Sequence, residues 1–240
     1  MDYNMNTLNQ DDEKEHLPSQ SNAQLKVEIP VPALIGVDDF IDYATEPIKA
    51  IDFIYYLLYF ISANSSYSAI LDLSEFINDT LDVFSLGRKE FLYRYSEWSN
   101  KTYPVVKNIR PLQILSVHYG SPISFDLLGI GSILEFIRDI GKDALWRANH
   151  EKLLAKSERE LKTTEVEKAK LEIANQKMAL EKMALELALQ KVELIERLYN
   201  LPLGSKEQTA IASVLGPKII AIVDKKASLS LVNETTKKVD

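Results

Sequence analysis

The sequence predicts a mostly helical α+β protein, with a small sheet of two to four strands packed on helices and a long coiled-coil-like helix after it. Three observations lead to this prediction. Residues 38–84 carry apolar side chains at helical spacing, residues 112–128 have the composition of a β-hairpin, and residues 142–201 contain neither glycine nor proline. We expect a disordered acidic tail over 1–24, a small α+β domain over 25–141, a long helix over 142–201, and a short helix with a candidate hairpin and a frayed end over 202–240.

Composition and charge limit the classes of function. The chain has 240 residues, a formal net charge of -7 and no cysteine. The negative charge argues against nonspecific nucleic-acid binding, because that mode needs excess Lys and Arg to neutralise phosphates. Without cysteine there are no disulfides, thiolate zinc sites or cysteine nucleophiles. The first residues lack a signal-peptide pattern, and no apolar run reaches the roughly 18 residues of a membrane span, so we expect a cytoplasmic protein.

The segment before residue 84 predicts one strand and two helices. Residues 25–32 alternate well enough for a short strand, and Pro30 and Pro32 would confine it to a sheet edge or end it. The pattern turns helical from Asp38. A polar break at 64–66 then separates this helix from a second one predicted over 69–84.

Residues 112–128 predict a hairpin, because two β-rich runs flank the turn Gly120-Ser121-Pro122. Gly129 and Gly131 follow the second run and precede a helix that starts near Ser132. Glycines in this position can cradle a phosphate, but the third glycine of the motif is missing and no βαβ series surrounds it. We interpret them as a plain turn from strand to helix.

The stretch 142–201 is rich in the helix formers Ala, Leu, Glu, Lys and Gln. Two series of apolar residues recur in it every seven positions, on faces about 200° apart. The first seam consists of Val166, Ile173, Leu180, Leu187 and Leu194, with Met183 at a matching position. The second seam consists of Leu171, Met178, Leu185, Val192 and Tyr199. Two seams imply more than one neighbour, so we predict that they form the interface of a homo-oligomer or bind a helical partner.

The same stretch is electrically balanced. From Glu151 to Tyr199 acids and bases number ten each, and residues 177–181 and 182–186 repeat the sequence Lys-Met-Ala-Leu-Glu. A continuous helix of this length would be about 90 Å long, too long for the segment after it to return along it. Either the C-terminal segment stays at the far end, or it joins the sheet of a neighbouring subunit, or the helix folds back near Ser157 to Thr164.

Residues 202–240 predict a short helix followed by one or two strands. Ser205-Lys206-Glu207-Gln208 fits a capping box at the start of the helix, and Gly216-Pro217 would end it. Residues 219–223 and 229–232 could then form a small hairpin or one added strand.

Residues 88–110 form the best candidate for an alternative function, a nucleic-acid-associated protein. They hold six basic and two acidic residues with aromatics between them, and stacking combined with positive charge is how single strands are bound. The candidate residues are Arg88, Lys89, Arg94, Trp98, Lys101 and Lys107. Packing explains the aromatics more simply, so we do not expect nucleic acid to be the main partner.

Residue types with catalytic or metal-binding chemistry are scattered. His16, His118 and His150 lie on unrelated segments, so a Ser-His-Asp arrangement would have to be assembled across different elements. Four carboxylates share one face of the helix predicted over 69–84, which is typical of a solvated amphipathic helix. We therefore expect no catalytic residue, no metal, no cofactor and no small-molecule substrate, and the protein is not expected to be an enzyme.

One segment carries a resemblance to other proteins. Leu112 to Tyr119 reads as a strand, and Tyr119-Gly120-Ser121-Pro122, a second strand, Gly129 and an apolar helix with a charged extension follow it. This order resembles a recurrent arrangement in uncharacterised bacterial proteins, over Leu112 to about Trp146. The resemblance implies a bacterial origin and a small α+β unit, but no activity and no site residues.

Some proteins of this general look are suspected adaptors in bacterial conflict systems. Our leading hypothesis is therefore a non-enzymatic oligomerising adaptor or scaffold in a bacterial conflict or stress system, with the two seams as its binding surface. On this hypothesis, replacing Leu180 and Leu187 with Asp should dissociate the assembly.

Overall fold

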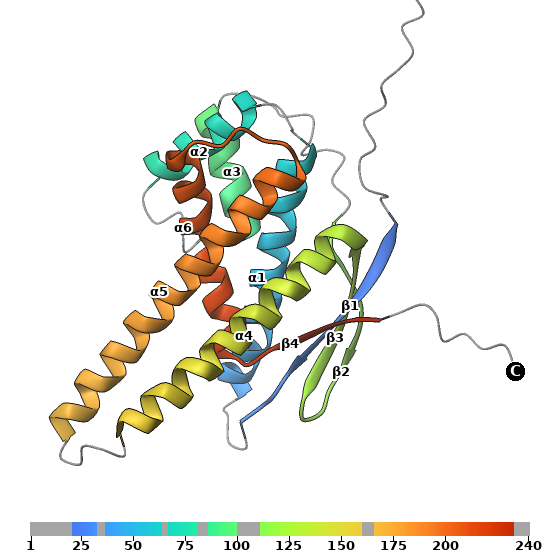
Figure 1. Cartoon of the computed structure of the whole chain (residues 1–240). Helices are drawn as coiled ribbons and strands as arrows, with labels where there is room; N and C mark the ends of the chain where they lie inside the picture. Colours follow the sequence, from blue (N-terminus) through green and yellow to red (C-terminus); the bar gives the residue numbers. More distant parts are fainter. Residues whose placement is uncertain are drawn as a thin grey trace, which may run out of the picture.

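A computed structural model describes residues 21–32, 37–63, 67–80, 86–99, 111–159 and 166–232, which form a four-stranded antiparallel sheet with helices packed on one face (Figure 1). The strands are β1 (Asn22–Ile29), β2 (Gln113–His118), β3 (Ile123–Ile130) and β4 (Ser228–Val232). The helices are α1 (Val37–Ala63), α2 (Tyr67–Asp79), α3 (Arg88–Ser99), α4 (Gly131–Arg159), α5 (Val166–Leu198) and α6 (Ser205–Asp224). The predicted α+β class and the hairpin over 112–128 are confirmed.

The sheet has the strand order β2-β3-β1-β4. Leu25, Val27 and Ile29 are fully buried and point toward the helices, as period-two alternation requires. Of the two effects expected of Pro30 and Pro32, the edge position is wrong, because β1 lies between β3 and β4. The other effect is confirmed, because β1 ends at Ile29, opposite Ile123, and Pro30 follows directly after the ladder. Residues 22–24 belong to β1 and so do not form part of a disordered tail; residues 1–20 lie outside the description.

The C-terminal segment differs from its prediction in one element. Helix α6 continues through Gly216 and Pro217 to Asp224, so the predicted stop at 216–217 and the strand over 219–223 are wrong. Proline removes one helical hydrogen bond, but Ile219 and Ile222 continue the buried face of this helix and outweigh that loss. Gly204, not Ser205, is the N-cap, and no side chain caps the helix. The alternative of one added strand is confirmed, as β4 pairs with β1.

The predicted continuous helix over 142–201 is two antiparallel helices (Figure 1). Lys191 Nζ of α5 lies 2.7 Å from Asp143 Oδ2 of α4, and Arg147 Nη2 donates a hydrogen bond of 2.7 Å to Gln190 Oε1. In one straight helix, residues 143 and 191 would be about 72 Å apart. Of the three alternatives weighed for this stretch, the fold-back agrees with the structure, because α4 ends at Arg159 and α5 begins at Val166.

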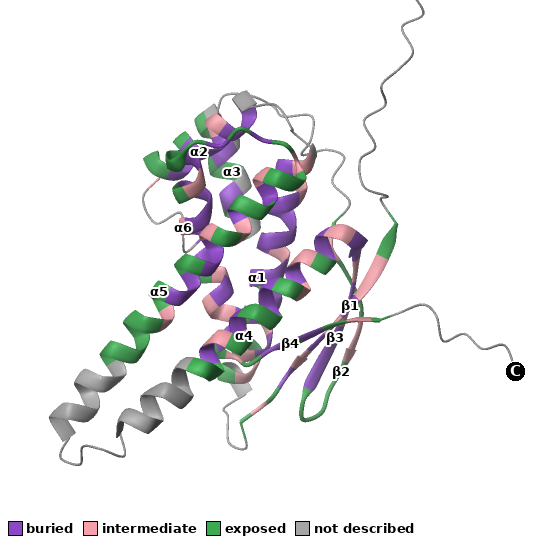
Figure 2. Ribbon diagram, viewed as in Figure 1, coloured by how far each residue is buried: buried purple, intermediate pink, exposed green. Residues whose placement is uncertain are grey.

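One hydrophobic core joins segments that the sequence divides into separate units. Buried residues of the predicted units 25–141, 142–201 and 202–240 belong to the same cluster. Helix α6 contacts α1, α2, α4 and α5, while α4 contacts β1, β3 and β4 (Figure 2). The three predicted units share one core because α6 packs on one face of α5 and also contacts helices of the other units.

Glycines permit two close approaches between helices and the sheet, one by α1 at Gly129 of β3 and one by α4, through Gly141, at β4. A Cβ added at Gly129 would lie 2.7 Å from the Tyr55 ring, and one added at Gly141 would collide with Leu229 of β4. The Tyr55 hydroxyl accepts a hydrogen bond of 3.1 Å from the Ile130 amide. Strand β3 passes directly into α4 at Gly131. The predicted passage from strand to helix is therefore found at Gly131, whereas Gly129 lies within β3, paired with Ala23, and not in a turn.

Candidate protein-docking surface

The first seam of α5 lies mainly in the core of its own chain. Met183 and Leu187 are 4% and 1% exposed, and Leu180 packs against the same cluster. Leu194, at the rim, is 39% exposed. The expectation that Leu187 binds a second molecule is wrong, because intramolecular contacts already cover it. An aspartate at this position would therefore test folding, not assembly.

The second seam passes from the core to the surface along α5. Val192 is fully buried, whereas Leu185 is 41% and Met178 58% exposed. Seven residues turn the helix about 20° short of two full turns, so a heptad series drifts around a straight helix. The backbone of Leu185 lies beside Gly216 of α6, and N-terminal to it the seam turns away from this neighbour. The predicted partner surface is reduced to this outer part.

Three predicted interface residues lie outside the description of side chains. Val166, Leu171 and Ile173 belong to α5, but their side-chain positions are not described. The description of burial on α5 begins at Ala174, and residues 174–179 are all exposed (Figure 2).

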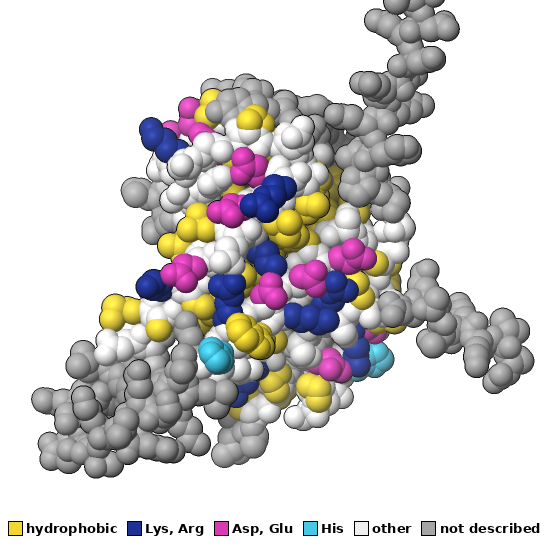
Figure 3. All heavy atoms as spheres, in the orientation of Figure 1, with side chains coloured by type: hydrophobic (Ala, Val, Ile, Leu, Met, Phe, Trp, Pro, Cys, Tyr) yellow, Lys and Arg dark blue, Asp and Glu magenta, His cyan; other side chains and the backbone are white. Residues whose placement is uncertain are grey.

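Helix α4 contributes an exposed aromatic residue that the sequence reasoning did not single out. Trp146 is 67% exposed and stacks on His150, with ring centroids 5.4 Å apart and an interplanar angle of 4°. A helical projection could have found it, because Trp146 lies opposite the buried residues Ala144 and Ala148. Figure 3 shows hydrophobic side chains exposed over the described outer parts of α4 and α5. Large apolar groups of this kind can gain free energy by docking a partner.

The predicted nucleic-acid patch is described only in part. Lys89 is exposed on α3, while Arg94 Nε donates a hydrogen bond of 2.7 Å to Glu90 on the same helix. Trp98 Nε1 donates a hydrogen bond of 3.3 Å to Asp79, and its ring stacks on Tyr95. Trp98 is therefore held by contacts within the protein, although it remains 37% exposed. The side chain of Arg88 and residues Lys101 and Lys107 are outside the description.

Pairing of β2 with β3 brings together Ser116 and His118 of β2 and Asp126 of β3. On the face opposite the helices, the Ser116 hydroxyl donates a hydrogen bond to Asp126, and its Oγ lies 3.1 Å from His118 Nε2. His118 Nε2 is 3.5 Å from Asp126 Oδ2. In a catalytic triad the imidazole lies between the hydroxyl and the carboxylate, whereas here the carboxylate binds the hydroxyl directly. The arrangement is suited to stabilising the β2–β3 hairpin.

The electrostatics of this cluster follow from the hydrogen bond. The Ser116 hydroxyl lowers the pKa of the Asp126 carboxyl below its ordinary value. Partial burial acts in the opposite direction, and Gln24 and His118 add smaller lowering effects. Among the residues that the structure describes, no group of three or more His, Asp or Glu side chains is placed to hold a metal ion.

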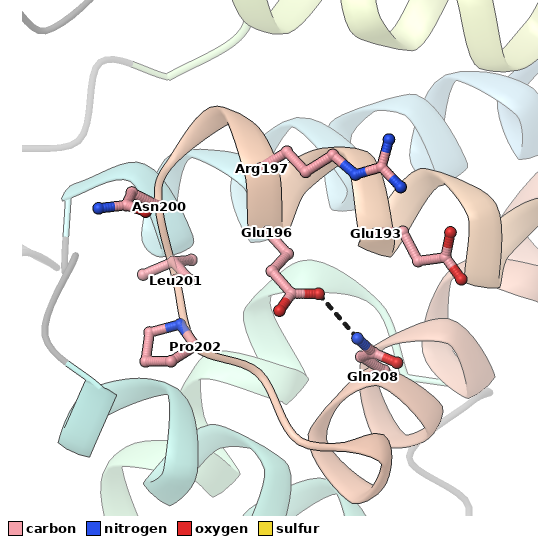
Figure 4. A pocket seen from close by; sticks show the side chains of 7 residues that line it. All are labelled: Glu193, Glu196, Arg197, Asn200, Leu201, Pro202 and Gln208. Atoms are coloured by element: carbon pink, nitrogen blue, oxygen red, sulfur yellow. Dashed lines mark hydrogen bonds between the residues drawn. The ribbon is translucent and has the colours of Figure 1, made fainter.

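An open cavity of about 760 Å³ lies where α5 turns into α6 (Figure 4). Glu196 Oε2 accepts a hydrogen bond of 2.7 Å from Gln208 Nε2, which ties the end of α5 to the start of α6. Glu193 and Arg197 also line it. Glu193 and Arg197 carry opposite charges, so the cavity does not favour a ligand of either sign. The hydrogen bond between Glu196 and Gln208 stabilises the turn from α5 to α6.

None of the described helices is both long enough and apolar enough to cross a membrane. Comparison with protein-family models, with curated proteins and with solved structures finds no match for this chain.

Proposed function

We propose that the protein is a non-enzymatic adaptor that self-associates through the outer part of the α4–α5 hairpin. The observation that carries this proposal is the exposure of Met178 and Leu185 on one stripe of α5, a helix whose opposite face is buried only from Met183 onward. Full burial of one such side chain contributes about 1.5 to 3 kcal/mol, so a second molecule that covers both would gain appreciable free energy. The exposed Trp146 on α4 offers a further contact of the same kind.

Charge supports a second copy over a strongly charged partner. The ten acids and ten bases between Glu151 and Tyr199 leave this region without net charge. A partner of one sign would gain little from it, whereas a helix of the same mixed composition can match its charges. A cytoplasmic location belongs to the proposal. A role in a bacterial conflict or stress system rests on the resemblance of residues 112–146 alone and stays a prediction.

Light scattering coupled to size exclusion, over a range of concentrations, tests self-association. We expect the wild type to exceed the monomer mass of 27.2 kDa and Leu185→Asp to return to it with an unchanged circular dichroism spectrum. Leu194→Asp is the matched control, because Leu194 has nearly the same exposed fraction but lies on the other seam. A wild type that stays at 27.2 kDa at every concentration would remove the proposal.

The alternative, binding of single-stranded nucleic acid through α3, has weaker support because Arg94 and Trp98 already have partners within the chain. A filter-binding titration separates the two functions, since a phosphate-based interaction weakens steeply with salt. Retention at low salt that is lost in Lys89→Glu would favour the alternative.

A further inference from the structure

The repeated sequence on α5 identifies how two copies would pack. We infer that α5 binds α5 of a second copy in antiparallel orientation, across a two-fold axis that passes between Glu181 and Lys182. This inference rests on the proposed self-association and adds its geometry. It is carried by the charge pattern of residues 177–186 together with the exposure of Met178 and Leu185 among them.

The five-residue repeat is complementary to itself when read in the opposite direction. Residues 177–181 and 182–186 are both Lys-Met-Ala-Leu-Glu. About the boundary between them, Lys177 lies opposite Glu186 of the second copy, and Glu181 lies opposite Lys182. Each of the four charged residues therefore meets an opposite charge. A parallel pair in register would instead place every charge opposite the same charge, which is destabilising.

The apolar residues obey the same symmetry. Met178 and Leu185 are each three and a half residues from the axis, so Met178 of one copy lies opposite Leu185 of the other. They are seven residues apart and differ by about 20° around the helix, which places them on one stripe. Both are exposed, at 58% and 41%. Glu181 and Lys182 flank this stripe on its two sides, where they can contact the second helix without being buried.

The packing within the chain leaves this stripe available. Helix α6 approaches α5 through Gly216, beside the backbone of Ala184 and Leu185. Ala184 and Ala188 face the core and are fully buried, while Lys182 and Glu186 are exposed and lie 3.8 Å apart. A two-fold axis makes both copies use the same surface, so one self-complementary patch closes a dimer. An unrelated helical partner would have no reason to match a sequence that is complementary to its own reverse.

Disulfide trapping tests the orientation. The chain has no cysteine, so an introduced thiol is the only one in each copy. We expect a mixture of Met178→Cys and Leu185→Cys, one of them carrying a tag, to form mainly the mixed disulfide under mild oxidation. Lys182→Cys, close to the axis, should link to itself. Efficient linking of Met178→Cys to itself, with little mixed product, would show parallel packing and overturn the inference.

Charge reversal tests the register. Glu181→Lys or Lys182→Glu places like charges together at two symmetric contacts, and we expect each to raise the dimer dissociation constant about tenfold. The double variant Glu181→Lys with Lys182→Glu restores opposite charges and should regain wild-type affinity. Lys206→Glu, which changes an exposed lysine at the start of α6, is the control for net charge and should have no effect. Circular dichroism confirms that each variant is folded.

The outcomes separate the inference from the function on which it rests. If the protein dimerises but neither Glu181→Lys nor Lys182→Glu changes the dimer dissociation constant, the antiparallel register is wrong while self-association stands. A wild type that remains monomeric removes both. Rescue by the double variant, together with the mixed disulfide, supports both.

Discussion

Lys191 of α5 holds its ammonium nitrogen 2.7 Å from the Asp143 carboxylate of α4, although 48 residues separate them. The Lys191 side chain is only 12% exposed and also lies over the Phe136 ring, with its nitrogen 6.0 Å from the ring centroid. This pair joins the two helices of the hairpin at the point where they leave the core. It shows that α4 pairs with its own α5, so a partner must use the remaining faces.

The Asp143–Lys191 pair should contribute measurably to stability. We expect Asp143→Ala to lower the free energy of unfolding by about 1 kcal/mol, because it leaves a partly buried ammonium without its carboxylate. Urea unfolding of this variant, of Lys191→Met and of the double variant gives the coupling energy. The exposed pair of Glu90 and Arg94 is the control, and its coupling should stay below about 0.5 kcal/mol. Equal coupling in both pairs would contradict the importance of burial.

Substitution of the buried Leu187 should affect folding, whereas substitution of the exposed Leu185 should affect association. Leu187 is 1% exposed, so Leu187→Ala should lower the free energy of unfolding by about 2 to 5 kcal/mol. Leu185→Ala, at the surface, should change it by no more than about 0.5 kcal/mol. Both are measured by urea unfolding in the Glu181→Lys background, where association is weakened. A large loss for Leu185→Ala there would place this residue in the core.

The contact between Gly141 and Leu229 should behave as one packing unit. Gly141→Ala should cost about 1 to 3 kcal/mol, because the new methyl group would collide with the Leu229 side chain. Leu229→Ala should cost about 2 to 5 kcal/mol through the cavity that it leaves. The double variant should lose less than the sum, because the smaller side chain makes room for the methyl group. Additive losses in urea unfolding would show that β4 does not rest on α4 in this way.

The hydrogen bond from Ser116 should make stability depend on acid pH. Because the pKa of Asp126 is lowered in the folded state, the bond stabilises the protein above the ordinary aspartate pKa of about 3.9, and this stability is lost as pH falls through the lowered value. Ser116→Ala should therefore be less stable than the wild type at neutral pH. The difference should shrink in acid.

An NMR titration of the Asp126 carboxyl checks the cause directly. Its pKa should rise in Ser116→Ala and stay unchanged in Ser230→Ala, an exposed serine on the same sheet. An unaltered pKa after removal of the Ser116 hydroxyl would assign the lowering to other neighbours.

Much of the secondary structure was predictable because its causes are local. The hairpin around Gly120-Ser121-Pro122 follows from β-rich runs and turn residues, and the α4 start follows from the change of period near Gly131. The Pro217 prediction was wrong for a non-local reason, since burial of Ile219 and Ile222 keeps α6 helical past the proline. The Ser116–Asp126 contact was not predictable, because it depends on the register of β2 against β3.

The sequence by itself determined that α5 has two apolar seams, that its charges balance and that residues 177–186 are complementary to their own reverse, because period, charge and order are properties of the chain. Only the tertiary structure decided which parts of those seams are covered. The cover for Leu187 and Val192 is provided by the fold-back of α5 on α4 and by α6, which lie near only after folding. Met178 and Leu185 remain exposed because residues seven apart are rotated by about 20° on a straight helix. Toward the start of α5 the seam therefore turns away from the side that packs against the rest of the chain.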